Sequence, residues 1–214
     1  MTTPSQTSSP ERRRSTAATA VLASALALSA IGSLSGCVAV LAGGAVGGGL
    51  LLTDRRTSGT QLEDEGIELK AGGRVREAIS DRGHVNVTSY NRIVLISGEV
   101  PTDADKEAVG KAIGAIENVT TVVNELGVSG NSSLTSRSSD AVITGRVKGA
   151  FIDAKDVQAN AIKVVTERGN VYLMGRVSER EATRAADIAR SQPSVLKVVR
   201  VFEILTDEQL ANLK

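Results

Sequence analysis

Aromatic side chains are scarce in this chain. Of its 214 residues, two are Phe, two are Tyr and none is Trp, so few rings are available on which unpaired bases could stack. The formal net charge is only +1, which leaves no broad basic field to hold a phosphate backbone. These two shortages argue against nucleic acid as a partner, and they require a core packed with Val, Ile, Leu and Ala.

Cysteine and histidine are scarcer still. The chain has one of each, Cys37 and His84, which rules out an intramolecular disulfide and makes a Cys/His metal site implausible. A Cys-His or Ser-His catalytic pair would need one of these two residues, and neither sits in a convincing site. His84 precedes an expected strand near a surface turn, so we interpret it as a solvated side chain. We therefore expect no enzyme, no metal, no cofactor and no small-molecule substrate.

The first 36 residues have the pattern of an export signal. The basic run Arg12-Arg13-Arg14 is followed by Ala17 to Leu34 without a charged residue, which is the order of a signal peptide. The next residues, Leu34-Ser35-Gly36-Cys37, resemble the bacterial lipobox, in which the cysteine thiol receives a diacylglyceryl group. We predict a lipoprotein signal peptide at residues 1–36 and lipidation of Cys37. The alternative is an uncleaved anchor helix with an unmodified cysteine.

Residues 37–65 are expected to form a tether. From Val38 to Leu52 the chain is uncharged and contains five glycines. As a helix this stretch would span about 22 Å, short of the roughly 30 Å of hydrocarbon in a bilayer. We interpret it as a flexible tether close to the bilayer. The alternative uses the small-xxx-small spacing of Gly43, Gly44, Gly47 and Gly48 to pack helices within a membrane.

The remainder of the chain contains two copies of one module. Residues 85–113 align with residues 162–190 at a constant shift of 77, which pairs Gly98 with Gly175. Each copy has the pattern helix, strand, strand, helix, strand. We predict an α+β fold of two tandem small modules, each a three-stranded mixed sheet packed by two helices. The predicted segments are module 1 at 66–128, a linker at 129–139, module 2 at 140–205 and a C-terminal tail at 206–214.

Local signals predict the turns and the helix starts. The first hairpin is expected to turn near Tyr90-Asn91, and the second at Glu167 to Asn170, where Gly and Asn tolerate positive φ. Ser178 to Glu181 has the pattern of a capping box, and its charges, with that of Arg176, are interpreted as an exposed cluster. A module of about 65 residues is marginally stable alone, so we expect the two modules to pack against each other.

Two short motifs identify the module. The hairpin ends in glycine in both copies, and the last strand has the pattern Val-x-x-Val. The motifs are Val94-Leu-Ile-Ser-Gly98, Val171-Tyr-Leu-Met-Gly175, Val119-x-x-Val122 and Val195-x-x-Val198. Residues 66–205 thus resemble a pair of BON modules. With the lipobox and the tether, the chain looks like the dual-BON outer-membrane lipoproteins of the DolP type.

That resemblance implies a lipid-anchored protein on the periplasmic side of the outer membrane, without catalytic residues. Members of the family bind anionic phospholipid, support envelope integrity and are linked to division sites and to the outer-membrane assembly machinery. Val38 agrees with this location, because in enteric bacteria an aspartate directly after the lipidated cysteine tends to retain a lipoprotein at the inner membrane.

The resemblance also implies where lipid is bound. In that family the first helix of the second module contacts phospholipid, and the matching stretch here is Ala141 to Ile152. Its apolar side chains can enter the acyl boundary while its basic ones meet anionic head groups. Relatives often have a large aromatic in place of Val142, and its loss is expected to weaken anchoring. An alternative assigns Val147 and Phe151 to the core. The predicted lipid-binding residues are Val142, Ile143, Arg146, Val147, Lys148 and Phe151.

We therefore predict a non-enzymatic outer-membrane lipoprotein that binds an anionic phospholipid membrane through its second module. The alternative is a periplasmic scaffold, in which the two modules hold assembly or division proteins and lipid serves only as the anchor.

Replacing Cys37 with Ser should leave the modules folded but misplaced, because every acyl chain is predicted to depend on that thiol. Separation of the inner and outer membranes should then find the variant missing from the outer membrane, with an unchanged circular dichroism spectrum of the folded modules. A variant that reaches the outer membrane in the same amount as the wild type would contradict lipidation of Cys37.

Overall fold

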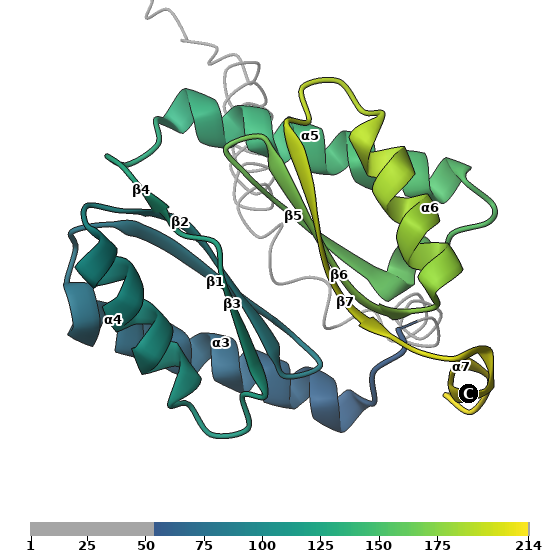
Figure 1. The fold of residues 1–214 in the computed structure, drawn as a ribbon, viewed down its shortest axis with the longest axis horizontal. Coiled ribbons are helices and arrows are strands. Elements are labelled where there is room, and N and C mark those ends of the chain that lie inside the picture. Colours follow the sequence, from purple (N-terminus) through teal and green to yellow (C-terminus); the bar gives the residue numbers. More distant parts are fainter. Residues whose placement is uncertain (1–53, 214) are drawn as a thin grey trace, which may run out of the picture. The chain divides into compact units, whose positions relative to one another are not determined.

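The computed structural model describes residues 54–213. The predicted signal peptide, Cys37 and the predicted tether as far as Thr53 lie outside the described residues. All described elements belong to one compact unit, residues 52–214. They follow the order helix, strand, strand, helix, strand twice, which confirms the predicted α+β fold of two modules (Figure 1).

Module 1 is a mixed sheet with two helices on one of its faces (Figure 1). Strand β1 runs antiparallel to β2, and β2 runs parallel to both β3 and the two-residue β4. The elements are α3 (Ser58–Ile79), β1 (His84–Tyr90), β2 (Ile93–Val100), α4 (Asp103–Gly114), β3 (Thr121–Asn124) and β4 (Gly127–Val128).

Module 2 repeats this arrangement with a longer third strand. Strand β5 is antiparallel to β6, which pairs in parallel with β7. The elements are α5 (Leu134–Asp153), the 3-10 turn η2 (Ala159–Ala161), β5 (Ile162–Glu167), β6 (Asn170–Val177), α6 (Glu179–Arg190), β7 (Lys197–Ile204) and α7 (Asp207–Ala211).

The first helix of each module begins before the predicted module boundary. Helix α3 starts within the predicted tether and α5 within the predicted linker, because a hydroxyl side chain caps each of them. Thr57 accepts a hydrogen bond from the backbone N–H of Thr60, and Ser133 accepts one from that of Ser136. The short helix α7 occupies the predicted tail.

The two hairpin turns adopt the same left-handed backbone. Asn91 and Arg92 have φ of 50° and 66°, and Arg168 and Gly169 have φ of 52° and 73°. Positive φ at both central residues gives a turn whose twist matches that of the flanking strands. The predicted turn regions are therefore correct, although the first turn is centred one residue later than Tyr90-Asn91.

One aspartate in each module joins its hairpin turn to its first helix. Asp64 accepts hydrogen bonds from both turn amides of the first hairpin, each at 2.8 Å. Asp140 accepts the two turn amides of the second, at 2.9 and 2.8 Å. Both side chains are buried. A buried carboxylate that accepts two backbone N–H groups is a strong local constraint.

The glycine that ends each hairpin motif is required by a close approach of the chain. A Cβ atom at Gly98 would collide with the backbone carbonyl of His84, and one at Gly175 would collide with that of Ala161. Gly98 also has φ of 112°, which L side chains rarely adopt. The glycines therefore allow the two antiparallel strands to pair closely at this end.

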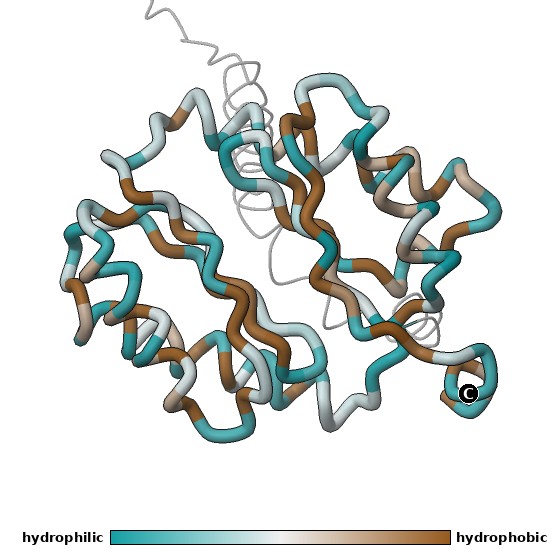
Figure 2. The backbone as a smooth tube through the Cα atoms, in the orientation of Figure 1, coloured by the Kyte–Doolittle hydropathy of each residue, from teal (hydrophilic) through white to brown (hydrophobic). Residues whose placement is uncertain are grey.

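Both faces of each central strand are buried. On one face the helices cover two aliphatic cores, which include Val94 and Ile96 in module 1 and Val171 and Leu173 in module 2. Figure 2 shows runs of hydrophobic residues along the strands, whereas hydrophilic and hydrophobic residues alternate along the helices. On the other face, side chains of both modules form a third cluster, here called the inter-sheet cluster: Tyr90, Leu95, Tyr172, Met174 and Val201. The two modules therefore pack against each other, as expected.

Replacing Asp64 or Asp140 with Asn should destabilise the fold by about 3 kcal/mol, because an amide oxygen satisfies the two turn amides less well than a carboxylate. Urea unfolding of residues 52–214 measures this loss. Asp153→Asn, at an exposed position on α5, is the matched control and should change little. Equal effects at all three positions would contradict this role for the buried aspartates.

The contribution of Asp64 should also depend on pH. Burial alone would raise its pKa, but hydrogen bonds from Ser89, Arg92 and Arg56 outweigh burial and hold the pKa below its ordinary value. Stability from such a group is present above the unfolded-state pKa of about 4 and is lost as pH falls through the lower folded-state pKa. The stability difference between wild type and Asp64→Asn should therefore shrink between about pH 5 and about pH 2.

Candidate functional site

Helix α5 buries three of the six residues predicted to bind lipid. Ile143, Val147 and Phe151 recur every four residues, which aligns them on one face of the helix. Their exposed fractions are 4%, 0% and 1%, and they belong to the core of module 2. The alternative that assigned Val147 and Phe151 to the core is therefore correct, and Ile143 belongs to the core as well. These three side chains cannot contact a bilayer in this conformation.

The opposite face of α5 exposes an apolar row. Leu134 is 79% exposed, Val142 is 52% exposed and Ile152 is 72% exposed. Between them, Ala141 and Gly145 are also exposed. Two of the three large apolar residues lay outside the predicted set, since the sequence alone did not show which face of the helix the sheet covers.

Basic side chains flank this row. Arg146 and Lys148 are exposed, and within the described part of the chain neither makes a hydrogen bond or ion pair. Helix α5 contains three basic and two acidic residues, and one of the acids is the buried Asp140. The exposed face of α5 is therefore both apolar and basic.

The equivalent helix of module 1 has the opposite charge balance. Helix α3 also exposes two leucines, Leu62 at 70% and Leu69 at 82%. It contains five acidic and three basic residues, however, and Glu65 lies exposed between the two leucines. The two modules thus carry related apolar rows in different electrostatic surroundings.

The structure also shows a polar site that the sequence did not predict. Asp54 to Thr57, here called the clasp segment, contacts both modules. Arg55 donates to both carboxylate oxygens of Glu181 at 2.8 and 2.9 Å, and to the backbone carbonyl of Arg176 at 2.7 Å. Arg176 in turn donates to the carbonyl of Arg55 at 3.1 Å. These contacts fix the start of the folded body to module 2.

The next residue of the clasp segment contacts module 1. Arg56 pairs with the buried Asp64 at 2.9 Å, and its guanidinium lies 4.2 Å from the centre of the Tyr90 ring. A cation over an aromatic face is attracted by the ring quadrupole. Burial raises the pKa of the Tyr90 hydroxyl to about 12, so this ring stays neutral.

The clasp segment corrects one prediction. Arg176 and Glu181 were expected in an exposed charge cluster, but Glu181 is 12% exposed and pairs with Arg55, and Arg176 is 19% exposed and pairs with Glu203. The hydrogen bonds from Arg55 hold the pKa of Glu181 below its ordinary value. The capping box predicted at Ser178 and Glu181 is present.

Polar contacts surround the inter-sheet cluster. Lys163 of module 2 pairs with Glu68 of module 1 at 2.9 Å, and Asn91 donates to Glu203 at 2.5 Å. Asn86 donates to Glu167 at 2.8 Å, although burial raises the pKa of that carboxyl. An apolar centre with a polar rim is the usual composition of a specific interface.

Between residues 54 and 213, no group of three or more His, Cys, Asp or Glu side chains is arranged to hold a metal ion. His84 lies 3.2 Å from the amide of Asn86. No helix in the same range is long and apolar enough to cross a membrane.

Comparison with known proteins identifies both modules. The BON domain family matches residues 64–130 and residues 139–206. The chain is 40% identical over 184 residues to the outer membrane lipoprotein DolP of Haemophilus influenzae, covering 85% of this chain and 95% of the relative. It is also 32% identical over 151 residues to a 21 kDa hemolysin of Actinobacillus pleuropneumoniae, covering 70% and 78%.

A third relative is the osmotically-inducible protein Y of Escherichia coli, 28% identical over 148 residues, which covers 65% of this chain and 72% of the relative. Among solved structures, CdsD, a structural protein of the type III secretion system of Chlamydia trachomatis, aligns with a TM-score of 0.28 at 10% identity, over 67% of this chain and 97% of that one. A likeness this low carries no argument.

Replacing Arg55 with Ala should loosen the two modules, because it leaves the partly buried Glu181 without its cation. We expect a loss of about 2 kcal/mol in urea unfolding and faster hydrogen exchange at Leu95 and Tyr172. Arg74→Ala removes an exposed pair with Glu77 and should cost less than about 0.5 kcal/mol. Exchange that accelerates only within residues 54–57 would contradict a role in holding the modules together.

Proposed function

The chain belongs to the BON domain family, as a dual-BON outer-membrane lipoprotein of the DolP type, and from that premise we propose that module 2 binds anionic phospholipid through the exposed face of α5. The single observation that carries the proposal is the apolar row Leu134, Val142 and Ile152 beside two unpaired basic side chains. The proposed function needs no catalytic step, and we infer that the protein is not an enzyme.

The geometry of α5 suits a helix that lies in the plane of the membrane surface. With 20 residues, the helix is about 30 Å long. Its apolar row is exposed at both ends and in the middle, so the whole length can contact the acyl boundary. Because the other face is packed on the sheet, the helix needs no conformational change to present the row.

Electrostatics favours an anionic surface. A basic residue close to such a membrane contributes about 1 kcal/mol, and neither Arg146 nor Lys148 must first break an ion pair within the described part of the chain. The aliphatic side chains add area-dependent burial at about 25 cal/mol per Å². These contributions are modest, so the contact is expected to be weak by itself.

A weak contact is sufficient for an anchored protein. Acylation of Cys37, as proposed, already holds the chain on a membrane, so α5 binds at a high effective concentration of lipid. We therefore propose that α5 orients the folded body and that the acyl chains hold it in place. Support for envelope integrity would follow from that positioning.

A second proposal is a scaffold for envelope proteins, such as outer-membrane assembly or division proteins. The observation in its favour is the row Leu62 and Leu69 on α3, which is apolar and exposed but lies beside acidic residues. Such a face is unsuited to anionic lipid. The two proposals therefore assign different helices and can be separated by experiment.

Val142→Asp combined with Ile152→Asp should reduce binding of residues 52–214 to phosphatidylglycerol vesicles by about tenfold or more, because two carboxylates would enter the acyl boundary. Arg146→Glu combined with Lys148→Glu should remove the preference over phosphatidylcholine vesicles. Co-sedimentation measures both effects.

The matched controls lie on α3. Leu62→Asp with Leu69→Asp makes the same change at residues of similar exposure, and Lys70→Glu with Arg76→Glu makes the same charge change. Both controls should bind as the wild type does. The proposal fails if the wild-type fragment shows no preference for phosphatidylglycerol, or if the α3 variants lose as much binding as the α5 variants. Loss of protein binding in the α3 variants would instead support the scaffold.

A further inference from the structure

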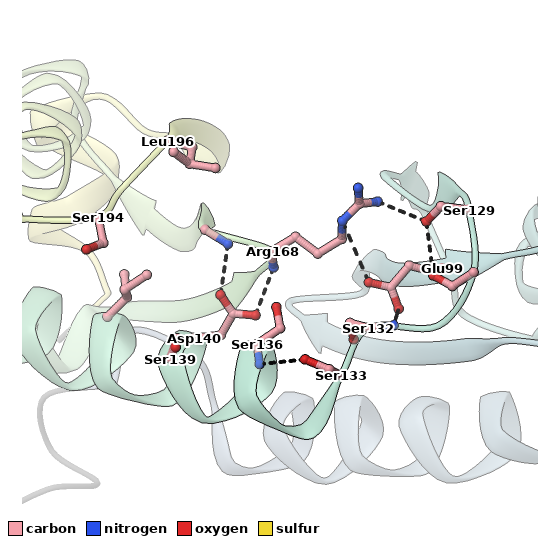
Figure 3. A pocket seen from close by; sticks show the side chains of 13 residues that line it. Glu99, Ser129, Ser132, Ser133, Ser136, Ser139, Asp140, Arg168, Ser194 and Leu196 are labelled. Atoms are coloured by element: carbon pink, nitrogen blue, oxygen red, sulfur yellow. Dashed lines mark hydrogen bonds and ion pairs between the residues drawn. The ribbon is translucent and has the colours of Figure 1, made fainter.

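A polar groove lies at the start of α5, and its lining includes none of the three residues of the apolar row. Its volume is about 860 Å³, and its lining comes from the end of module 1, the first turns of α5 and the β5–β6 turn (Figure 3). Six serines contribute to the lining: Ser129, Ser132, Ser133, Ser136, Ser139 and Ser194. The hydroxyls of Ser136 and Ser194 make no hydrogen bond within residues 54–213. Free hydroxyls and the N–H groups of a helix start offer hydrogen bonds to a ligand.

A buried carboxylate in this groove lacks part of its hydrogen bonding. Glu99 is fully buried, and its Oε2 accepts from the backbone N–H of Ser132 at 3.2 Å. Its Oε1 makes no hydrogen bond and faces the guanidinium of Arg168 at 3.8 Å, which is too long for one. A buried acceptor left in this state is costly and needs a physical explanation. A donor group on a ligand would supply it.

The second carboxylate of the groove is already satisfied. Both oxygens of Asp140 accept from the β5–β6 turn (Figure 3). The available groups are therefore the acceptor of Glu99, the donors of Arg168 and the free hydroxyls of Ser136 and Ser194. Arg168 is 46% exposed and donates to the hydroxyl of Ser129 at 3.3 Å. Beside them, Leu196 is 78% exposed and provides an apolar surface.

These groups select among ligand classes. The carboxylate of Glu99 would repel a simple anion, and the guanidinium of Arg168 would repel a simple cation. A hydroxyl group both donates and accepts, so a ligand with several hydroxyls can satisfy Glu99, Arg168 and the serines together. The C–H face of a sugar ring can then lie on Leu196.

The geometry points to a glycan-binding groove between Glu99, Arg168 and the start of α5. Its ligand is a polyhydroxylated chain, and the envelope offers two sources, the glycan strands of the cell wall and the sugars of lipopolysaccharide. This groove is formed by other residues than the exposed apolar row of α5, and its occupancy does not require lipid binding.

Titration of isotope-labelled residues 52–214 with a soluble N-acetylglucosamine oligomer, in the absence of lipid, tests the proposal. We expect amide shifts at Ser132, Ser136 and Gly169. Arg168→Ala should weaken binding by about tenfold, because it removes a charged donor. Arg184→Ala is the matched control, since Arg184 is 50% exposed and pairs with Asp156, and it should bind as the wild type does.

A second variant covers the case in which Arg168→Ala disturbs the module interface. Ser139→Phe fills the groove from an exposed position on α5 and should also abolish the shifts while thermal unfolding stays unchanged. Co-sedimentation with purified cell-wall sacculi and titration with lipopolysaccharide core oligosaccharide then distinguish the two sources. Binding to either supports the proposal.

Three outcomes would overturn it. The first is an absence of shifts with all three glycans, and the second is an equal loss of binding in Arg168→Ala and Arg184→Ala. The third is that inorganic phosphate or phosphoethanolamine alone reproduces the shifts, which would assign the groove to an anion or a zwitterion.

Discussion

The structure depends on the burial of a second face of each sheet. Two helices cover only one side of each sheet, and a module of this size cannot leave the other side in water. The inter-sheet cluster, with Leu95 from one module and Met174 from the other, solves the problem for both sheets at once. It explains why β2 and β6 are apolar on both faces. It also makes the two modules one body, so that any surface of module 2 is held in a defined relation to module 1.

Much of the fold follows from local patterns. The capping box at Ser178 and the glycines at Gly98 and Gly175 indicated a helix start and two hairpin ends, because each depends on one or two neighbouring residues. The repeat then extended every assignment from one module to the other. Asp64 and Asp140 are equivalent residues of the two modules, 76 positions apart, so the repeat could have identified them. The neighbouring acids Glu63 and Glu65 made Asp64 hard to distinguish.

The surface was harder to predict, since it depends on which side of a helix the sheet covers. Apolar residues occur all around α5, and the choice between Phe151 as core and Ile152 as surface needs the position of the sheet. Long-range pairs pose the same difficulty. Arg55 and Glu181 are 126 residues apart, and no local pattern connects an arginine that follows an apolar stretch with a glutamate in a capping box. Charged residues that the sequence suggests are solvated can thus form ion pairs between distant segments of the chain.

The clasp segment has a mechanical consequence for a protein held by its amino terminus. Tension on the chain that precedes Asp54 would enter the folded body at Arg55 and Arg56, which are bound to different modules through Glu181 and Asp64. The force is thus divided between module 2, through Glu181, and the second turn of α3, through Asp64. Thermal movement of the membrane therefore acts on two ion pairs at once. The hydrogen bonds in the first turn of α3 are protected from breaking one after another.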